Sequence, residues 1–332
     1  MSGNAWRRAT GPIGIDITTH AVRVVQLQRR GKSVRLFATG SAVGPGPLGS
    51  AELLGDAIRE AVRSAGGRGS RCVLSVPTLC AHARNLRLPD LPDRELDQAV
   101  RFEAQATLGQ GALQHFDAGR VGAGSDTRRE VVALSVSETD TDRWLRAVDH
   151  AGLKPLAFDA APAAFARTLE FAGRLDPADP ANTAQPTQDN ADPAPVTAAI
   201  LELGPSHAAA HFVQPGRVLF SKSLPALEPD NLDPGPSDPL VREFALCLRY
   251  LMVTFRGLHP QHLYAMGDAA DREPWLRAIA QQTGLDAQPF CGLGQRLQGA
   301  GDAWNCPKAA QWALATGLAL RPAKETHAER AA

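Results

Sequence analysis

The chain has 332 residues, enough for about two domains with a buried core. Hydrophobic residues make up 44% of it and charged residues 21%, which is typical of a globular protein. Thirty-five Lys and Arg balance 35 Asp and Glu, which argues against binding to nucleic acid or to an acidic membrane through net charge. No segment approaches the roughly 18–20 uninterrupted apolar residues of a membrane span, and residues 1–10 lack the apolar centre of a secretion signal. We therefore expect a cytoplasmic protein.

A segment rich in proline and aspartate divides the chain. Residues 176–195 contain five prolines and four aspartates but no Ile, Leu, Val, Met or aromatic residue. Such a segment cannot bury enough apolar surface to offset the entropy lost on ordering. We therefore expect a first unit at 11–175, a linker at 176–195 and a second unit at 196–322. The ends of the chain, 1–10 and 323–332, are expected to be flexible.

Both units begin with the same pattern. Each opens with a short apolar run that ends in an acidic residue, Asp16 in the first unit and Glu202 in the second, and two further apolar runs follow after turns. Short apolar runs separated by Gly and Pro predict a β-meander. The expected strands are 13–16, 21–27 and 34–37 in the first unit and 197–201, 207–213 and 218–220 in the second. This repeat predicts that the two units share one fold.

Helical patterns follow each meander. Apolar residues at i, i+3 and i+4 predict amphipathic helices, and these are expected at 51–65, 93–108, 138–151, 161–173, 240–255, 274–283 and 308–318. Further strands are expected at 72–76, 131–136, 155–159 and 262–266. Strands that alternate with helices indicate an α/β architecture.

Asp16 and Glu202 allow two interpretations. An acid at the end of an apolar strand, followed by a tight turn, can hold a hydrated Mg²⁺ beside nucleotide phosphates, because magnesium takes a few carboxylates and keeps several waters. Alternatively, each acid caps its own turn through backbone amides. From the residue types alone, the capping interpretation is favoured.

Two pairs of histidines have spacings that could suggest a metal site. His207 and His211 are four residues apart, and His259 and His262 are three apart. No Asp, Glu or Cys lies near enough in the sequence to complete a convincing ligand set. We therefore expect surface or loop histidines. No Ser-His-Asp relation follows from spacing alone, so hydrolase chemistry has no support in the sequence.

Several short motifs occur in a fixed order along the chain. They are IGIDITTHAVRVVQL at 13–27, RNLRLP at 84–89, DRELDQAVRFEA at 93–104 and AGLKP at 151–155. Their residues and order resemble those of the type IV pilus assembly protein PilM family. The resemblance covers about 11–170 well and 196–320 loosely.

The resemblance implies a duplicated actin-like (sugar kinase/Hsp70/actin) ATPase fold, an α/β fold with mixed sheets flanked by helices. It also implies a PilM-type subdomain inserted at about 70–155, and a cleft between the two halves for ATP and Mg²⁺. Carried over by position, the implied nucleotide contacts are Asp16, Thr18, Thr19, Arg23, Glu202, Gly204 and Gly267, with Asp16 as the magnesium candidate.

The chain departs from the family pattern in all three nucleotide turns. Thr18 stands where the family has Gly, and a β-branched residue does not readily adopt a positive φ. Glu202 replaces Asp, and the following Pro205 lacks an N–H donor. Met266 replaces the first Gly of the third turn. These departures predict that ATP binds weakly or not at all and that the chain is not an enzyme.

The resemblance implies a scaffold that binds the cytoplasmic N-terminal peptide of a PilN-like inner-membrane protein through its first half. Pilus motor ATPases are further candidate partners, nucleic acid is not expected, and the membrane is reached only through the partner, so the expected location is peripheral at the inner membrane. Two alternatives remain open: an active ATPase or small-molecule kinase of the same fold, and an MshI- or GspL-like component of pilus or secretion biogenesis.

Overall fold

The first half of the chain forms a sheet whose centre is an antiparallel meander. The computed structural model describes residues 9–31, 33–108, 111–122, 127–178, 195–228, 231 and 233–322. The strands of this sheet are β1 (Ala9–Ile17), β2 (Ala21–Arg30), β3 (Ser33–Val43), β4 (Arg71–Val76) and β8 (Lys154–Ala160). The first three pair antiparallel, whereas β4 runs parallel to β1 and β8 parallel to β4. The strand order is therefore β3-β2-β1-β4-β8.

The second half repeats this topology. Its strands are β9 (Ala198–Leu203), β10 (Ala208–Gln214), β11 (Arg217–Leu224), β12 (His262–Met266) and β13 (Asp286–Pro289). The order β11-β10-β9-β12-β13 has the same antiparallel and parallel pairings as the first half. The predicted duplication of the meander is confirmed, and β1 and β9 occupy equivalent central positions.

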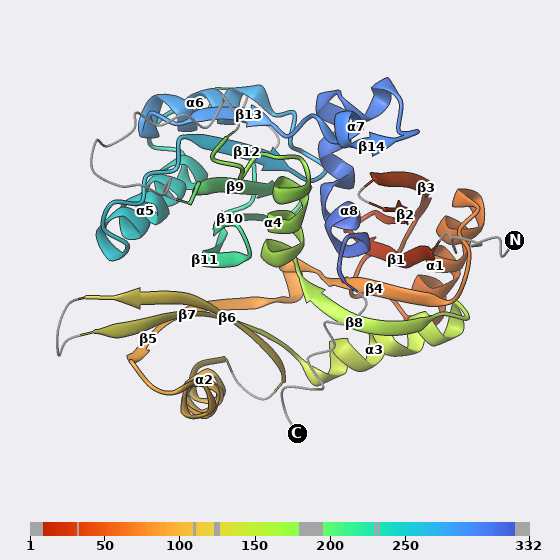
Figure 1. Ribbon diagram of the computed structural model, residues 1–332, viewed down its shortest axis with the longest axis horizontal. Helices are drawn as coiled ribbons and strands as arrows, with labels where there is room; N and C mark the ends of the chain where they lie inside the picture. Colours follow the sequence, from red (N-terminus) through yellow and green to blue (C-terminus); the bar gives the residue numbers. More distant parts are fainter. Residues whose placement is uncertain are drawn as a thin grey trace, which may run out of the picture.

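Helices cover both sheets (Figure 1). Their bounds are α1 (Ala51–Ala65), α3 (Glu138–His150), α4 (Ala161–Phe171), α5 (Pro239–Thr254), α6 (Glu273–Thr283) and α8 (Ala313–Ala319). In the first half, α1 and α3 pack together on one side of the sheet and α8 packs on β1, β2 and β4 from the other. In the second half, α5 contacts β10 and β11, and α6 contacts α5 and β13.

The two halves exchange elements and so share one core. Helix α8 comes from the end of the chain but packs in the first half, while α4 follows the first half and contacts both α8 and the strands β10 and β11. Their contact is close: a Cβ at Gly317 would lie 1.9 Å from the carbonyl oxygen of Ala164. Because the backbones of α4 and α8 touch at this point, only glycine fits at position 317. A short strand, β14 (Leu297–Gln298), also joins the edge of β3.

A small third sheet is inserted into the first half (Figure 1, lower left). It consists of β5 (His82–Pro89), β7 (Arg128–Val136) and β6 (Ala112–Val121), with α2 (Asp93–Leu108) packed on it. This unit, called here the inserted subdomain, has its own apolar core, made by Leu86, Leu88, Leu96, Val100, Val131 and Ala133. Within the expected range 70–155, β4 and α3 pack in the first half, so the separate sheet is built from 82–136.

Local sequence patterns place most elements well. The predicted helix at 51–65 matches α1, and its N-cap Ser50 accepts a hydrogen bond from the amide of Leu53. The predicted helix at 308–318 is instead a 3-10 helix, η5 (Pro307–Trp312), followed by α8. Shorter elements are η1 (Thr78–Cys80), α7 (Leu293–Arg296) and η4 (Asp302–Trp304). In the described ranges, no helix combines the length and apolar character needed to cross a membrane.

Candidate functional site

The residues expected to contact nucleotide line one cleft between the two halves. Asp16, Thr18, Thr19, Arg23, Glu202, Gly204 and Gly267 all border it. Arg23 lies near the beginning of β2. The others lie at or just beyond the carboxyl ends of β1, β9 and β12, and such strand ends commonly form ligand sites in α/β sheets. The space left in the cleft is about 40 Å³, whereas a site for a drug-sized ligand has roughly 300–1,000 Å³.

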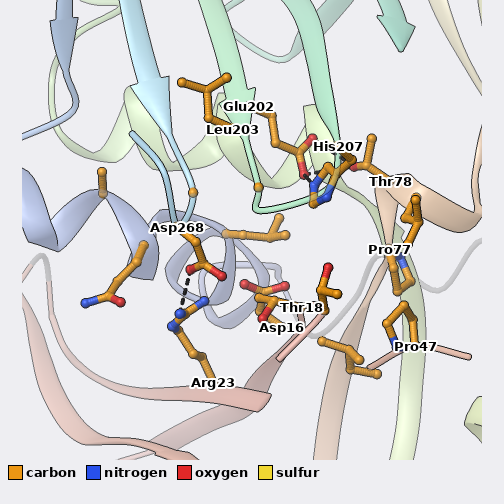
Figure 2. A pocket seen from close by; sticks show the side chains of 18 of the residues that line it. Asp16, Thr18, Arg23, Pro47, Pro77, Thr78, Glu202, Leu203, His207 and Asp268 are labelled. Atoms are coloured by element: carbon orange, nitrogen blue, oxygen red, sulfur yellow. Dashed lines mark hydrogen bonds and ion pairs between the residues drawn. The ribbon is translucent and has the colours of Figure 1, made fainter. Parts of the chain in front are cut away.

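Glu202 is buried and fully engaged by the protein itself (Figure 2). Thr78 Oγ1 lies 2.9 and 2.8 Å from its two carboxylate oxygens. His207 Nε2 lies 3.3 Å from Oε1, and His211 Nε2 lies 3.1 Å from Oε2. Although burial alone disfavours the charged form, these hydrogen bonds and the nearby imidazoles hold the pKa of Glu202 well below its usual range. Both carboxylate oxygens already accept donors from side chains.

His207 fills the space above the second turn. A Cβ at Gly204 would lie 2.1 Å from Cε1 of the His207 ring, so the ring lies directly against Gly204. Burial lowers the pKa of His207, but the hydrogen bond and the charge of Glu202, together with Asp16, outweigh it and the pKa is raised. The buried Nδ1 atom of His207 has no hydrogen-bond partner within the described residues.

Asp16 is a buried carboxyl with weak stabilisation of its charge. Burial raises its pKa from 3.8 to about 7; Arg23 opposes this shift, and Asp268 and Glu202 add to it. One neighbour, Ser75, donates its hydroxyl to Asp16 Oδ1 at 3.4 Å. In the metal-free protein near neutral pH, a substantial fraction of Asp16 is therefore protonated.

Arg23 is directed across the cleft to the second half (Figure 2). Its Nη2 lies 2.5 Å from Asp268 Oδ1, and its guanidinium carbon lies 6.0 Å from the centre of the Trp312 ring. Only 10% of the Arg23 side chain and 15% of the Asp268 side chain are exposed. The positive charge of Arg23 is thus neutralised by the carboxylate of Asp268, which belongs to the third turn.

The amide donors of the three turns are used internally. In the first turn, the Thr18 amide donates to the carbonyl of Ala21, and the Ala21 amide donates to Thr18 Oγ1. In the second, the Gly204 amide donates to the carbonyl of His207. In the third, the Gly267 amide donates to the carbonyl of Ala310. Phosphate-binding turns present such amides to the ligand, whereas the amides named here already donate to carbonyl or hydroxyl oxygens of the protein.

As they lie, these residues do not fit a bound nucleotide with Mg²⁺. The cleft is small, the turn amides named above are occupied, and both oxygens of Glu202 already have side-chain partners. Within the described ranges, no group of three or more His, Cys, Asp or Glu is placed to hold a metal ion. Every described non-glycine residue has a negative φ, Thr18 included. The first turn therefore lacks the positive φ that the glycine of the family would permit.

The prediction for one histidine was wrong. His211, expected at the surface, is 1% exposed in β10, where its Nδ1 lies 2.9 Å from Ser221 Oγ. Glu202, His211 and Ser221 thus form a hydrogen-bonded chain that has the residue types of a hydrolytic triad. Ser221 is 2% exposed and does not line the cleft, so no substrate can reach its hydroxyl and the chain is structural.

Two further cleft residues, Thr78 and Asp268, and the nearby Ser206 were not assigned a role from the sequence. Thr78 lies two residues after the end of β4, and Asp268 two residues after the end of β12. The signal available in the sequence for both residues was their position just after a predicted strand. Ser206 lies in the second turn, and its hydroxyl is 3.1 Å from that of Thr19 in the first turn. Only the fold brings these residues opposite their partners.

Comparison with known proteins places the fold. No protein-family model matches the chain, and a search of curated proteins gives no match. Among solved structures, a chain of the "PilM-PilN type IV pilus biogenesis complex" matches with a TM-score of 0.71 at 17% identity, covering 94% of this chain and 98% of that chain. The two chains share one fold.

Two weaker likenesses accompany this match. The ethanolamine utilization protein EutJ from Carboxydothermus hydrogenoformans has a TM-score of 0.48 at 12% identity, with 96% of this chain and 91% of that chain covered. A Bacteroides thetaiotaomicron protein described as having an actin-like ATPase fold has a TM-score of 0.47 at 10% identity, with 95% and 99% covered. The duplicated actin-like fold predicted from the sequence is confirmed by the shared topology and the PilM-PilN match.

Proposed function

We propose that this protein is a cytoplasmic scaffold of type IV pilus assembly that is held at the inner membrane by the N-terminal peptide of a PilN-like protein. The observation that carries the proposal is the fold match over 94% of this chain and 98% of a chain of the PilM-PilN complex. The ordered motifs at 13–27, 84–89, 93–104 and 151–155 support it. Its task is then to bind partners on its surface rather than to catalyse a reaction.

The edge strand β8 is the proposed peptide site in the first half. Strand β8 pairs with β4 on one side, and in the described part of the chain no strand pairs with its other side. Gln114 of the inserted subdomain donates to the carbonyl of Phe158 in β8, so this edge lies beside the subdomain. Leu156 and Phe158 are half-buried there. An extended peptide can add to such an edge through main-chain hydrogen bonds and place alternate side chains in apolar pockets.

Weak or lost ATP binding is the second part of the proposal. It is supported by the occupied turn amides, by the His207 ring over Gly204 and by the three side chains that engage Glu202. Calorimetry of the full chain with ATP and Mg²⁺ is expected to give no measurable heat of binding. A dissociation constant in the micromolar range that weakens in Asp16→Ala would instead favour the alternative, an active ATPase or kinase of this fold.

Peptide docking is tested by fluorescence anisotropy with the labelled N-terminal peptide of the PilN-like protein. The full chain is expected to bind, and Leu156→Glu to lose at least tenfold in affinity because it places a charge beside the proposed edge. Leu246→Glu, at a residue 41% exposed on α5 of the second half, is the matched control and should bind like the wild type. Absence of wild-type binding would refute docking, and equal loss in both variants would refute the assignment to β8.

A further inference from the structure

Three polar contacts join the two halves directly across the cleft. Each connects a side chain of the first half with one of the second: Thr19 with Ser206 at 3.1 Å, Thr78 with Glu202 at 2.8 Å, and Arg23 with Asp268 at 2.5 Å. Together these six residues are called the cleft clamp. Each of the three turns expected to contact nucleotide contributes to it, so the clamp occupies the positions that a ligand would bridge.

Two of the three clamp contacts are largely buried, whereas the Thr19–Ser206 contact is exposed. The ion pair of the clamp is largely shielded from solvent, with side-chain exposures of 10% for Arg23 and 15% for Asp268, and removal of one partner from a buried pair leaves an uncompensated charge. Glu202 is 5% exposed and accepts hydrogen bonds from three side chains. These contacts differ from surface ion pairs, which contribute little because water competes for them.

We infer that the cleft clamp holds the two halves closed without bound nucleotide, so that the chain's own side chains do the bridging that a ligand does in a cleft of this kind. The inference concerns the resting conformation of the cleft and does not depend on a peptide partner. Closure by the clamp can therefore be disproved while peptide docking is confirmed, and peptide docking can be disproved while closure is confirmed.

A hydrogen-bonded relay extends the clamp to the inserted subdomain. From Glu202 it runs through His211 to Ser221 Oγ in β11. The main chain of Ser221 is in turn bound by Asn85 of β5, whose Nδ2 donates to the Ser221 carbonyl at 3.0 Å and whose Oδ1 accepts from the Ser221 amide at 3.3 Å. The inserted subdomain is thereby joined to the same hydrogen-bonded network as Glu202.

The double variant Thr19→Cys/Ser206→Cys tests closure directly. The two hydroxyls are 3.1 Å apart, so cysteines at these positions are expected to form a disulfide under mild oxidation in nucleotide-free protein. The cross-link is identified by mass spectrometry of the linked peptides. Each single variant, measured in parallel, controls for pairing with the five native cysteines, which are all free in the structure. Addition of ATP and Mg²⁺ should leave the rate of cross-linking unchanged.

Two outcomes would overturn the inference. Cross-linking that requires ATP and Mg²⁺ would mean that the cleft is open without nucleotide. Cross-linking that ATP and Mg²⁺ slow at least tenfold would agree with closure and would instead contradict the proposed loss of ATP binding. No cross-link under any condition would likewise contradict closure, provided that the double variant retains the wild-type circular dichroism spectrum.

A measurement on single variants keeps the test valid if the cysteine pair does not fold. Asp268→Asn removes one charge of the clamp, and Glu243→Gln removes one charge of the exposed pair Lys222–Glu243, which lies within the second half. Asp268→Asn is expected to speed amide exchange in the turns at residues 18–20 and 204–207 at least tenfold, and Glu243→Gln to leave it unchanged. Equal exchange in both variants would show that the cross-cleft pair does not hold the halves.

Discussion

Asp16 offers the sharpest test of the electrostatics of the cleft. Its carboxyl is buried, its pKa is raised to about 7, and one hydroxyl, that of Ser75, donates to it. Replacement of Asp16 by Asn keeps the shape of the side chain and removes the titrating group. The variant should therefore have a higher free energy of unfolding than the wild type at each pH at which the raised pKa of Asp16 destabilises the folded wild type.

The magnitude follows from the difference between the folded and unfolded pKa values. Between pH 3.8 and about 7 the folded protein binds more protons at Asp16 than the unfolded chain does, so wild-type stability falls as pH rises. Above pH 7 both states are ionised and the deficit stays constant. A rise of about 3 pKa units at about 1.4 kcal/mol per unit sets an upper limit of about 4 kcal/mol. At pH 5 the same relation gives a deficit of about 1–2 kcal/mol.

Urea unfolding at pH 5, 6, 7 and 8 measures this difference. The free energy of unfolding of Asp16→Asn minus that of the wild type should increase with pH and level off near pH 8. Asp149→Asn, which removes an exposed carboxylate of α3, is the control and should show little change with pH. A stability difference for Asp16→Asn that is the same at pH 5 and pH 8 would refute the inferred burial of a poorly stabilised charge.

Two further substitutions test the packing and the hydrogen bonds of the cleft. Glu202→Gln places an amide where donors from Thr78, His207 and His211 converge, and should lower the free energy of unfolding by about 1–3 kcal/mol at pH 7. Because the pKa of Glu202 is lowered in the folded protein, this loss should shrink as pH falls below about 4; a loss that grows on acidification in urea melts would contradict it. Gly317→Ala forces a methyl group against the carbonyl of Ala164 and should lower the melting temperature by several degrees, whereas Gly235→Ala, where the added Cβ meets nothing within 4 Å, should not. Similar melting temperatures for these two variants would contradict the close contact of α4 with α8.

The duplicated core could be predicted from the sequence because its signals are local. Strands β1 and β9 are short apolar runs that end near an acid and a turn, and α1 has a regular apolar stripe behind a serine cap. These patterns need only a few neighbouring residues. They therefore indicated two copies of one α/β unit and placed Asp16 and Glu202 at equivalent strand ends.

In the inserted subdomain, the strand predicted at 131–136 corresponds to β7, whereas β5 and β6 were not predicted because their sequences are mostly polar. In β5, half-buried and exposed positions alternate over much of its length, and only Leu86 and Leu88 are buried. Strand β6 has a single buried residue, Ala118. A hydrophobic period of two was too weak in either segment to be recognised.

The pairings inside the cleft could not be read from one sequence because they join distant residues. Thr78 and Glu202 are 124 positions apart, and Thr19 and Ser206 are 187 apart. His211 was assigned to the surface because polar residues usually lie there. Strand β10 is buried along its whole length, however, so its sequence carries no alternation that would have shown the histidine to be internal.

We propose above that the protein acts by binding a partner and does so without nucleotide. This proposal is tested most directly by the affinity of the full chain for the N-terminal peptide of the PilN-like protein, measured without ATP and again with saturating ATP and Mg²⁺. The same dissociation constant is expected under both conditions. Binding that appears only with ATP, or that changes tenfold or more when ATP is added, would contradict it.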